Sequence, residues 1–246
     1  MRNLKIIIEY EGTNYKGWQR QANGITIQEV IEGVISGITG ENIKVYGSGR
    51  TDSGVHATGQ VANFKSETVL STVQLIKAMN SSLPEDIVVT DCEEVPDDFH
   101  SQYSAKKKTY IYRILNRPYP SALLRNTTWF RRNELDIQAM QNAVEKLVGE
   151  HDFRLFAHAN ITVKTTMRKI YNAKLVRKND LIIFEIEANG FLKRMVRMIT
   201  GALYLIGTGI MTIDQFCGML NGRKSKDINI ISAPARGLFL KKVDYI

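Results

Sequence analysis

Cysteine, proline and long apolar runs are all scarce in this sequence. Its 246 residues include two cysteines and five prolines. The cysteines, Cys92 and Cys217, have neither CxxC spacing nor a histidine partner pattern, so we expect no disulfide framework and no zinc site. Both are predicted to be thiols of the protein core.

No apolar run approaches the roughly 20 residues that a helix needs to cross a bilayer. The first residues, MRNLKIIIEYEG, reach acidic side chains too early for a secretory signal. The sequence therefore predicts a cytoplasmic protein that has no membrane segment.

Acidic residues are outnumbered, with 25 Asp and Glu against 33 Lys and Arg, which gives a net charge of +8. Long-range attraction then favours a polyanionic partner, although charge alone is a weak indication. The content of 43% hydrophobic and 24% charged residues is ordinary for a folded soluble protein. The chain is long enough for one large domain or two halves, each with its own core.

Hydrophobic periodicity predicts the elements of the first hundred residues in the order βαββαβ. The capping-box pattern of Thr26 and Glu29 marks the start of the first helix. The expected elements are a strand in residues 3–12, a helix after Thr26, strands at 43–47 and 57–65, a helix at 71–82 and a strand at 87–95.

The same order starts again near residue 106. The expected elements are a strand at 107–115, a helix at 136–148 ended by Gly149, strands at 169–177 and 181–189 around an Asn179-Asp180 turn, helices at 191–206 and 213–220, and a strand at 237–246. We therefore predict an α+β protein with two similar halves, residues 1–104 and 105–246. Together they would form one extended, mainly antiparallel sheet with helices on one face and a central cleft.

A stretch rich in glycine, YGSGRTDSGVHATGQVANF, lies between two of the predicted strands. Neither GxxxxGK[ST] nor GxGxxG fits it, so nucleotide hydrolysis ranks low. If the backbone is extended, Arg50 and Asp52 project to one side, and the guanidinium favours the ionised carboxylate that a nucleophile or base requires. The alternative is a surface ion pair worth less than about 1 kcal/mol. The residues alone leave both interpretations open.

The stretch GRTDSGVHATGQVANF resembles the catalytic signature of the tRNA pseudouridine synthases of the TruA type, which usually reads GRTDAGVHA followed by GQV and a phenylalanine. Ser53 replaces the commoner alanine. Other matching stretches follow in order: YEGTNYKGWQRQ, FHSQYSAKKKTYIYR, GEHDF, NGFLKRMVRMITG and APARGLFLKKVDY. The RLFAHAN segment departs from the pattern. The resemblance spans nearly the whole chain and implies the pseudouridine synthase fold.

This resemblance implies an isomerase that converts uridine to pseudouridine in the anticodon stem-loop of tRNA, around positions 38, 39 and 40. The reaction moves the ribose from N1 to C5 of the uracil without a net redox change, so no cofactor and no metal are expected. Members of this family work as homodimers on tRNA, which implies the same for this chain.

Five positions match functional residues of the family. The resemblance implies that Asp52 is the catalytic carboxylate and that Arg197 is its basic partner. Tyr110 would stack on the target base, Leu238 would pack under the uracil, and Arg50 would support the flipped-out base. Without the resemblance, these would be an ordinary helix arginine, a sheet tyrosine, a buried leucine and a turn ion pair.

Basic side chains interleaved with aromatic ones are the candidates for phosphate contacts. They are Lys106, Lys107 and Lys108, beside Tyr103, Tyr110 and Tyr112, together with Lys193, Arg194, Arg223, Lys224 and Lys226. The histidines show no ligand spacing, and we interpret them as structural or RNA-contacting. They are His56, His100, His151 and His158.

Two other functions compete with the isomerase. An RNA-binding protein without chemistry would have no use for Asp52, because a carboxylate repels a phosphate-rich ligand. A carboxylate-dependent hydrolase would need a second acid or a metal cluster, and the sequence shows neither pattern. The joint presence of Asp52, Tyr110 and Arg197 therefore favours the isomerase.

Overall fold

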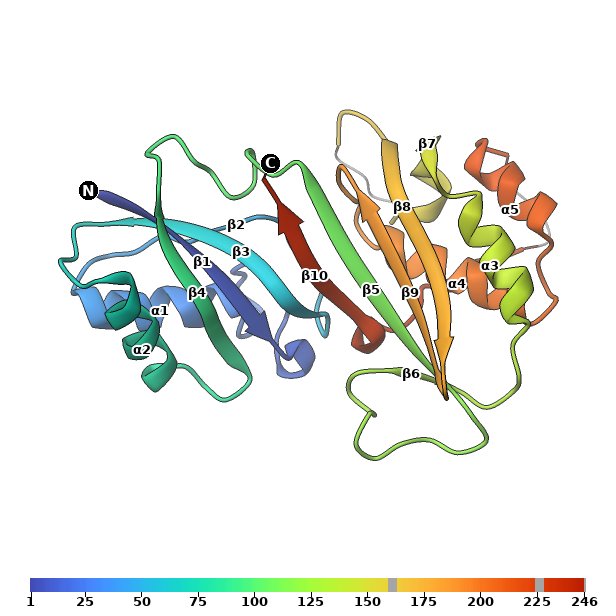
Figure 1. Ribbon diagram of the computed structural model, residues 1–246, viewed down its shortest axis with the longest axis horizontal. Coiled ribbons are helices and arrows are strands. Elements are labelled where there is room, and N and C mark those ends of the chain that lie inside the picture. The colour runs from blue at the N-terminus through green and yellow to red at the C-terminus, as the bar shows by residue number, and fades with distance from the viewer. Residues whose placement is uncertain (159–162, 224–227, 246) are drawn as a thin grey trace. The chain divides into compact units, whose positions relative to one another are not determined.

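The computed structural model describes residues 1–158, 163–223 and 228–245, and it divides into two compact units (Figure 1). Unit 1 comprises Met1–Lys106 with Phe239–Ile246, and unit 2 comprises Lys107–Leu238. The expected boundary at residues 104 and 105 stays a prediction, and the last strand groups with unit 1 rather than with the second half of the chain. Lys224 and Lys226, two of the expected phosphate contacts, lie outside the described residues.

Unit 1 has the predicted βαββαβ order. Its elements are β1 (Arg2–Tyr10), α1 (Ile27–Thr39), β2 (Tyr46–Gly47), β3 (His56–Ser66), α2 (Thr72–Ser82), β4 (Ile87–Val95) and most of β10 (Leu238–Asp244). The strands lie in the order β4-β1-β3-β10, with β2 on β3. All pairs are antiparallel except β10 with β3, which run parallel.

Alternating apolar side chains of β1 build the core of unit 1. Leu4, Ile6 and Ile8 are completely buried, and Tyr10 almost so. Each such aliphatic side chain stabilises the fold by about 1.5–3 kcal/mol. In the sheet Ile6 faces Ala62 of β3 and Cys92 of β4, so the strand is buried between two neighbours.

Unit 2 carries the second set of elements with two additions. It contains β5 (Lys107–Asn116), β6 (Trp129–Arg131), α3 (Ile137–Glu145), β7 (Gly149–Asp152), β8 (Met167–Lys178), β9 (Leu181–Ala188), α4 (Met195–Gly207) and α5 (Ile213–Leu220). The strand order is β5-β9-β8-β7, antiparallel throughout, while β6 runs parallel to β5. In β9 every second side chain is buried, and α3 packs on β8 and on α4 (Figure 1).

Three sequence predictions in unit 2 are wrong in detail. The short strands β6 and β7 were not predicted, because three or four residues show no measurable period. The helix α4 begins at Met195 rather than at residue 191, since Arg194 has a φ of 64° and cannot lie within a helix. The helix α3 ends at Glu145, and Gly149, with a φ of 122°, starts β7.

Neither cysteine takes part in a disulfide. Cys92 is buried in β4 and Cys217 is half-buried in α5. Burial raises the pKa of the Cys92 thiol to about 11, so it stays protonated and unreactive at neutral pH. The prediction of a core thiol is therefore confirmed for Cys92. In the part of the chain that the structure describes, no helix has the length and apolar character to cross a membrane.

The capping box at the start of α2 gives a test of the local fold. The Ser71 hydroxyl accepts from the Gln74 backbone N–H at 3.3 Å, and the Gln74 side chain accepts from the Ser71 N–H at 2.9 Å. We predict that Ser71→Ala lowers the free energy of unfolding by about 1 kcal/mol, measured by urea denaturation. Ser71→Asp keeps an acceptor and should lose little, so an equal loss in both variants would exclude the cap as the cause.

Candidate active site

The loop that carries Asp52 connects β2 to β3. Tyr46 pairs with Asn63 and Gly47 with Ala62, so the predicted hairpin around this loop is confirmed. Within the loop Arg50 is exposed, Asp52 is half-buried and Thr51 between them is buried. Arg50 is therefore accessible and Asp52 partly accessible, on either side of a buried threonine.

Buried polar groups hold the loop from beneath. The hydroxyls of Tyr10 in β1 and Thr51 are 2.8 Å apart and share a hydrogen bond. The Gln60 amide nitrogen in β3 donates to the Gly49 carbonyl at 3.0 Å. Burial raises the pKa of the Tyr10 phenol above its ordinary value, and hydrogen bonds with Thr51 and Gln60 offset this only in part, so the hydroxyl stays protonated. Both neighbours of Arg50 are thus fixed to the sheet.

A second motif, YEGTNYKGWQRQ, packs directly against this loop. The Trp18 N–H donates to the Thr51 carbonyl at 3.1 Å. A Cβ at Gly17 would lie 2.5 Å from that carbonyl oxygen, and Gly17 has a φ of 92°. Only glycine allows this approach without strain. Two stretches far apart in the sequence therefore form one structure around Thr51.

Ser53, which stands where the family pattern usually has alanine, uses its hydroxyl in the same contact. The Ser53 Oγ donates to the Tyr15 carbonyl at 3.0 Å. The replacement therefore adds a hydrogen bond between the Asp52 loop and the segment before Trp18, at an exposed position.

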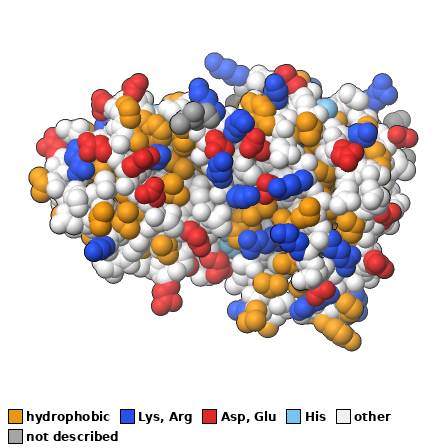
Figure 2. Space-filling model, viewed as in Figure 1, with side chains coloured by type: hydrophobic (Ala, Val, Ile, Leu, Met, Phe, Trp, Pro, Cys, Tyr) orange, Lys and Arg blue, Asp and Glu red, His pale blue; other side chains and the backbone are white. Residues whose placement is uncertain are grey.

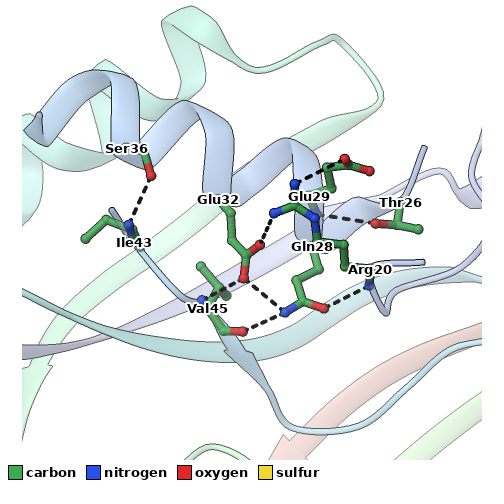
Figure 3. A network of polar contacts seen from close by, with 8 residues as sticks. All are labelled: Arg20, Thr26, Gln28, Glu29, Glu32, Ser36, Ile43 and Val45. Carbon is green, nitrogen blue, oxygen red and sulfur yellow. Dashed lines mark hydrogen bonds and ion pairs between the residues drawn. The ribbon is translucent and has the colours of Figure 1, made fainter. Parts of the chain in front are cut away.

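The helix α1 anchors the segments on both sides of this contact (Figure 3). The Glu32 carboxylate is buried and accepts from the Val45 N–H and the Gln28 amide, both at 3.0 Å. It also accepts from the Arg20 guanidinium at 3.4 Å, while the Gln28 side chain accepts from the Arg20 N–H at 3.0 Å. Three hydrogen bonds to one carboxylate offset the cost of its burial.

The start of α1 matches the predicted capping box only in part. The Thr26 hydroxyl accepts from the Glu29 N–H at 3.4 Å, as predicted. The Glu29 carboxylate lies 3.5 Å from the Arg20 guanidinium (Figure 3). The side chain of Glu29 therefore contributes to the Arg20 cluster.

Unit 2 carries the other expected site residues. Tyr110 in β5 is buried and contacts Phe191 edge to face, with ring centroids 5.0 Å apart. In α4, the Arg197 Nε donates to the Ala233 carbonyl at 2.7 Å, which directs the guanidinium toward the segment that ends at Leu238. Arg197 and the APARGL stretch are thus brought together within one unit.

Whether Arg50 and Asp52 meet the unit 2 residues stays a prediction, since the two groups belong to different units.

Tyr112 differs from its expected place as an aromatic contact beside the lysines. It is completely buried, and its hydroxyl donates to the Pro234 carbonyl at 2.7 Å. Tyr112 is therefore a core residue.

The candidate phosphate contacts differ in exposure. Lys106, Lys193, Arg194 and Arg223 are exposed, as an RNA contact requires. Lys107 is half-buried, pairs with Glu187 at 3.4 Å and lies 4.9 Å from the centre of the Tyr171 ring. Burial lowers the pKa of Lys108 to about 8, so the amine still carries its charge at pH 7 and loses it above about pH 8.

Two of the four histidines hold structural positions. His56 is buried, accepts from the Gly12 N–H at 3.0 Å and stacks on Phe239. His151 packs edge to face on Phe153. Across the described ranges, no three His, Cys, Asp or Glu side chains gather in a group that could hold a metal ion.

The family model described as tRNA pseudouridine synthase matches residues 6–104 and 143–246 of this chain. The chain belongs to this family. A "tRNA pseudouridine synthase A" of Thermoanaerobacter sp. (strain X514) is 45% identical over 247 residues, covering all of both chains. Another of the same name, from Acetivibrio thermocellus, is 44% identical over 245 residues, again covering both.

Family membership confirms the resemblance, the α+β fold class and the assignment to isomerases of tRNA. Among solved structures, a chain of "Crystal Structure of a Cbf5-Nop10-Gar1 Complex" aligns with 81% of this chain and 54% of its own length. The identity is 14% and the TM-score 0.32, an overlap too low to add support.

Sequence reasoning missed the residues that support the loop. Tyr10 fits the alternating apolar pattern of β1, and this pattern predicts only a core residue. Gln60 and Thr51 are polar residues with almost no exposure, and Gln60 is followed in β3 by the buried apolar residues Val61 and Ala62. A polar residue at an inward strand position was the one available signal, because such a residue must have a hydrogen-bond partner.

The contact of Gly17 with the loop can be tested by adding a methyl group. We predict that Gly17→Ala lowers the free energy of unfolding by more than about 1 kcal/mol, because φ is positive and the new Cβ meets the Thr51 carbonyl. It should also speed hydrogen exchange of the loop amides. Gly37→Ala in α1, where a Cβ meets nothing within 4 Å, is the control and should be stabilising. Equal stability of the two variants would contradict the close approach.

Proposed function

We propose that this protein isomerises uridine to pseudouridine in the anticodon stem-loop of tRNA, around positions 38, 39 and 40, with Asp52 as the catalytic carboxylate. The observation that supports this most is the accessible Asp52 on a loop fixed through Thr51, in a chain that matches the family over most of its length.

The chemistry conserves atoms and electrons. The bond between ribose C1′ and uracil N1 breaks, the base turns, and C1′ joins C5. The C5 hydrogen leaves as a proton and N1 gains one, so no redox partner is needed. An ionised carboxylate can attack the ribose or the ring, or remove a ribose proton, and each route needs it beside a base that has left the stack.

Arg50 has the chemistry to support the flipped-out base. Extruding a nucleotide costs a few kcal/mol, and a planar guanidinium can stack in its place and also hydrogen-bond. Arg50 is exposed, while Gly49 and Thr51 on either side of it are held by the sheet. This supports the role, because a side chain on a rigid backbone loses less conformational entropy when it binds.

The roles of the unit 2 residues complete the proposal. Arg197 would pair with Asp52 and keep it ionised, Tyr110 would stack on the uracil, and Leu238 would pack beneath it. The hydrogen bond from Arg197 to Ala233 supports a fixed guanidinium. A homodimer, a cytoplasmic location and tRNA phosphate contacts by Lys106, Lys107, Lys108, Lys193 and Arg194 belong to the same proposal.

Replacement of the carboxylate tests the proposal. We predict that Asp52→Asn abolishes tritium release from tRNA labelled at C5 of uridine, because the amide is neither nucleophile nor base. Affinity for tRNA should stay within a few fold, since phosphate contacts dominate binding. Asp98→Asn removes the same charge from an exposed position and should keep full turnover. Continued tritium release by Asp52→Asn would refute the assignment.

The lysines of β5 give an independent test of RNA contact. Replacing Lys107 and Lys108 by alanine should weaken tRNA binding and reduce the slope of log Kd against log salt by about one unit per lost phosphate contact. The control is Lys77→Ala with Lys146→Ala, which removes the same charge from exposed positions in α2 and at the end of α3. An unchanged slope in the first variant would place the RNA elsewhere.

A further inference from the structure

Three rings and a lysine form a row on unit 1, which we call the aromatic ladder: Lys44, Tyr46, His100 and Tyr103. The Lys44 amine lies 5.3 Å from the centre of the Tyr46 ring. The Tyr46 and His100 centroids are 5.2 Å apart, and those of His100 and Tyr103 are 4.4 Å apart. Tyr46 is 38% and Tyr103 79% exposed.

Hydrogen bonds of the backbone and of neighbouring residues hold the segments that carry the ladder. The loop after β4 carries Ser101, whose hydroxyl donates to the Tyr46 carbonyl and whose N–H donates to Asn63 at 2.9 Å. The Tyr245 hydroxyl donates to the Ser101 carbonyl at 2.8 Å. The backbone at Tyr46 and beside His100 is therefore fixed before any ligand arrives, which lowers the entropic cost of binding.

His100 is also fixed in its hydrogen-bonding state. Its Nδ1 accepts from the Gln102 N–H at 3.1 Å, so the proton of the neutral ring lies on Nε2. The Ser104 N–H bonds to the His100 carbonyl at 2.9 Å. The imidazole thus packs between two tyrosines, and its Nε2–H remains as a donor.

A single exposed tyrosine is common on protein surfaces and needs no explanation. In the ladder, by contrast, three rings contact one another and a lysine amine lies over the Tyr46 ring at one end. Unpaired nucleotides bind to such rows, since every base has a face that stacks and its phosphate attracts a cation. Lys106 is exposed three positions after Tyr103, and Asp97 nearby is paired with Lys65 at 2.5 Å. The exposed Asp98 also lies two positions before His100, so recognition here depends on the rings and on the Lys44 amine rather than on the net charge of the surroundings.

We propose that the aromatic ladder binds an unpaired nucleotide of the tRNA substrate, separate from the uridine that reacts. The base stacks on Tyr103, the outermost and most exposed ring, and the backbone follows the ladder toward Lys44. Tyr46 and Gly47 form β2, which leads into the Asp52 loop, so the ladder and that loop belong to the same hairpin. This inference rests on the proposed function, because it takes tRNA as the ligand.

The test compares Tyr103→Ala with Tyr103→Phe, which keeps the ring. In Tyr103→Ala the Kd and KM for tRNA should rise about fivefold or more, since loss of one stacked base costs that much or more, while kcat stays unchanged. Tyr103→Phe should stay within twofold. Tyr119→Ala, which removes a tyrosine of 74% exposure in unit 2, is the matched control and should also stay within twofold.

A second measurement separates stacking from general attraction. Tyr103→Ala should weaken binding of a single-stranded oligoribonucleotide and leave binding of a duplex of equal length unchanged. Equal Kd values for Tyr103→Ala and wild type, or an equal loss with the duplex, would overturn the ladder as a nucleotide site. A wild-type protein that binds tRNA through Tyr103 but releases no tritium would refute the proposed function alone.

Discussion

The residue between Arg50 and Asp52 is the point on which the site in unit 1 depends. Thr51 is held by its side chain to Tyr10 of β1 and by its carbonyl to the Trp18 N–H. A loop rich in glycine would otherwise sample many conformations, because glycine restricts the backbone so little. With Thr51 fixed on both sides, the side chains before and after it have a defined direction.

Other buried polar side chains also hold the loop and the segments next to it through hydrogen bonds. Gln60 fixes Gly49, and α1 fixes the Trp18 segment and the segment before β2 through Gln28 and Glu32 (Figure 3). The polar groups involved are almost inaccessible to water, so each unmade bond would cost about 1–3 kcal/mol. A functional loop can therefore be short of apolar contacts and still be rigid.

Basic side chains are unevenly distributed over the surface of the protein. On the face drawn in Figure 2, Lys and Arg side chains gather over the strands of unit 2, whereas Asp and Glu side chains are spread over both units. The aromatic ladder adds to unit 1 a place where rings contribute more than charge. For a polyanionic partner, the basic surface supplies affinity that depends on salt, while stacking adds contacts that do not.

Periodicity predicted the long elements because their buried faces repeat. β4 was predicted with the correct bounds and α5 likewise, since a capping residue or a turn marks each end. The short strands β6 and β7 and the true start of α4 at Met195 were missed, because pairing partners and the left-handed backbone of Arg194 decide them.

By itself, the sequence determined the α+β class, the hairpin around Asp52 and the family. Local patterns carry these, since apolar alternation, caps and a distinctive motif depend on residues near one another in the chain. Tertiary structure alone decided that Tyr10, Gln60 and Gly17 support the loop. It also decided that Tyr112 is a core residue and that the rings of the aromatic ladder contact one another. Most of these contacts join residues that are tens of positions apart in the sequence, and only the pairing of strands and the packing of loops brings them together.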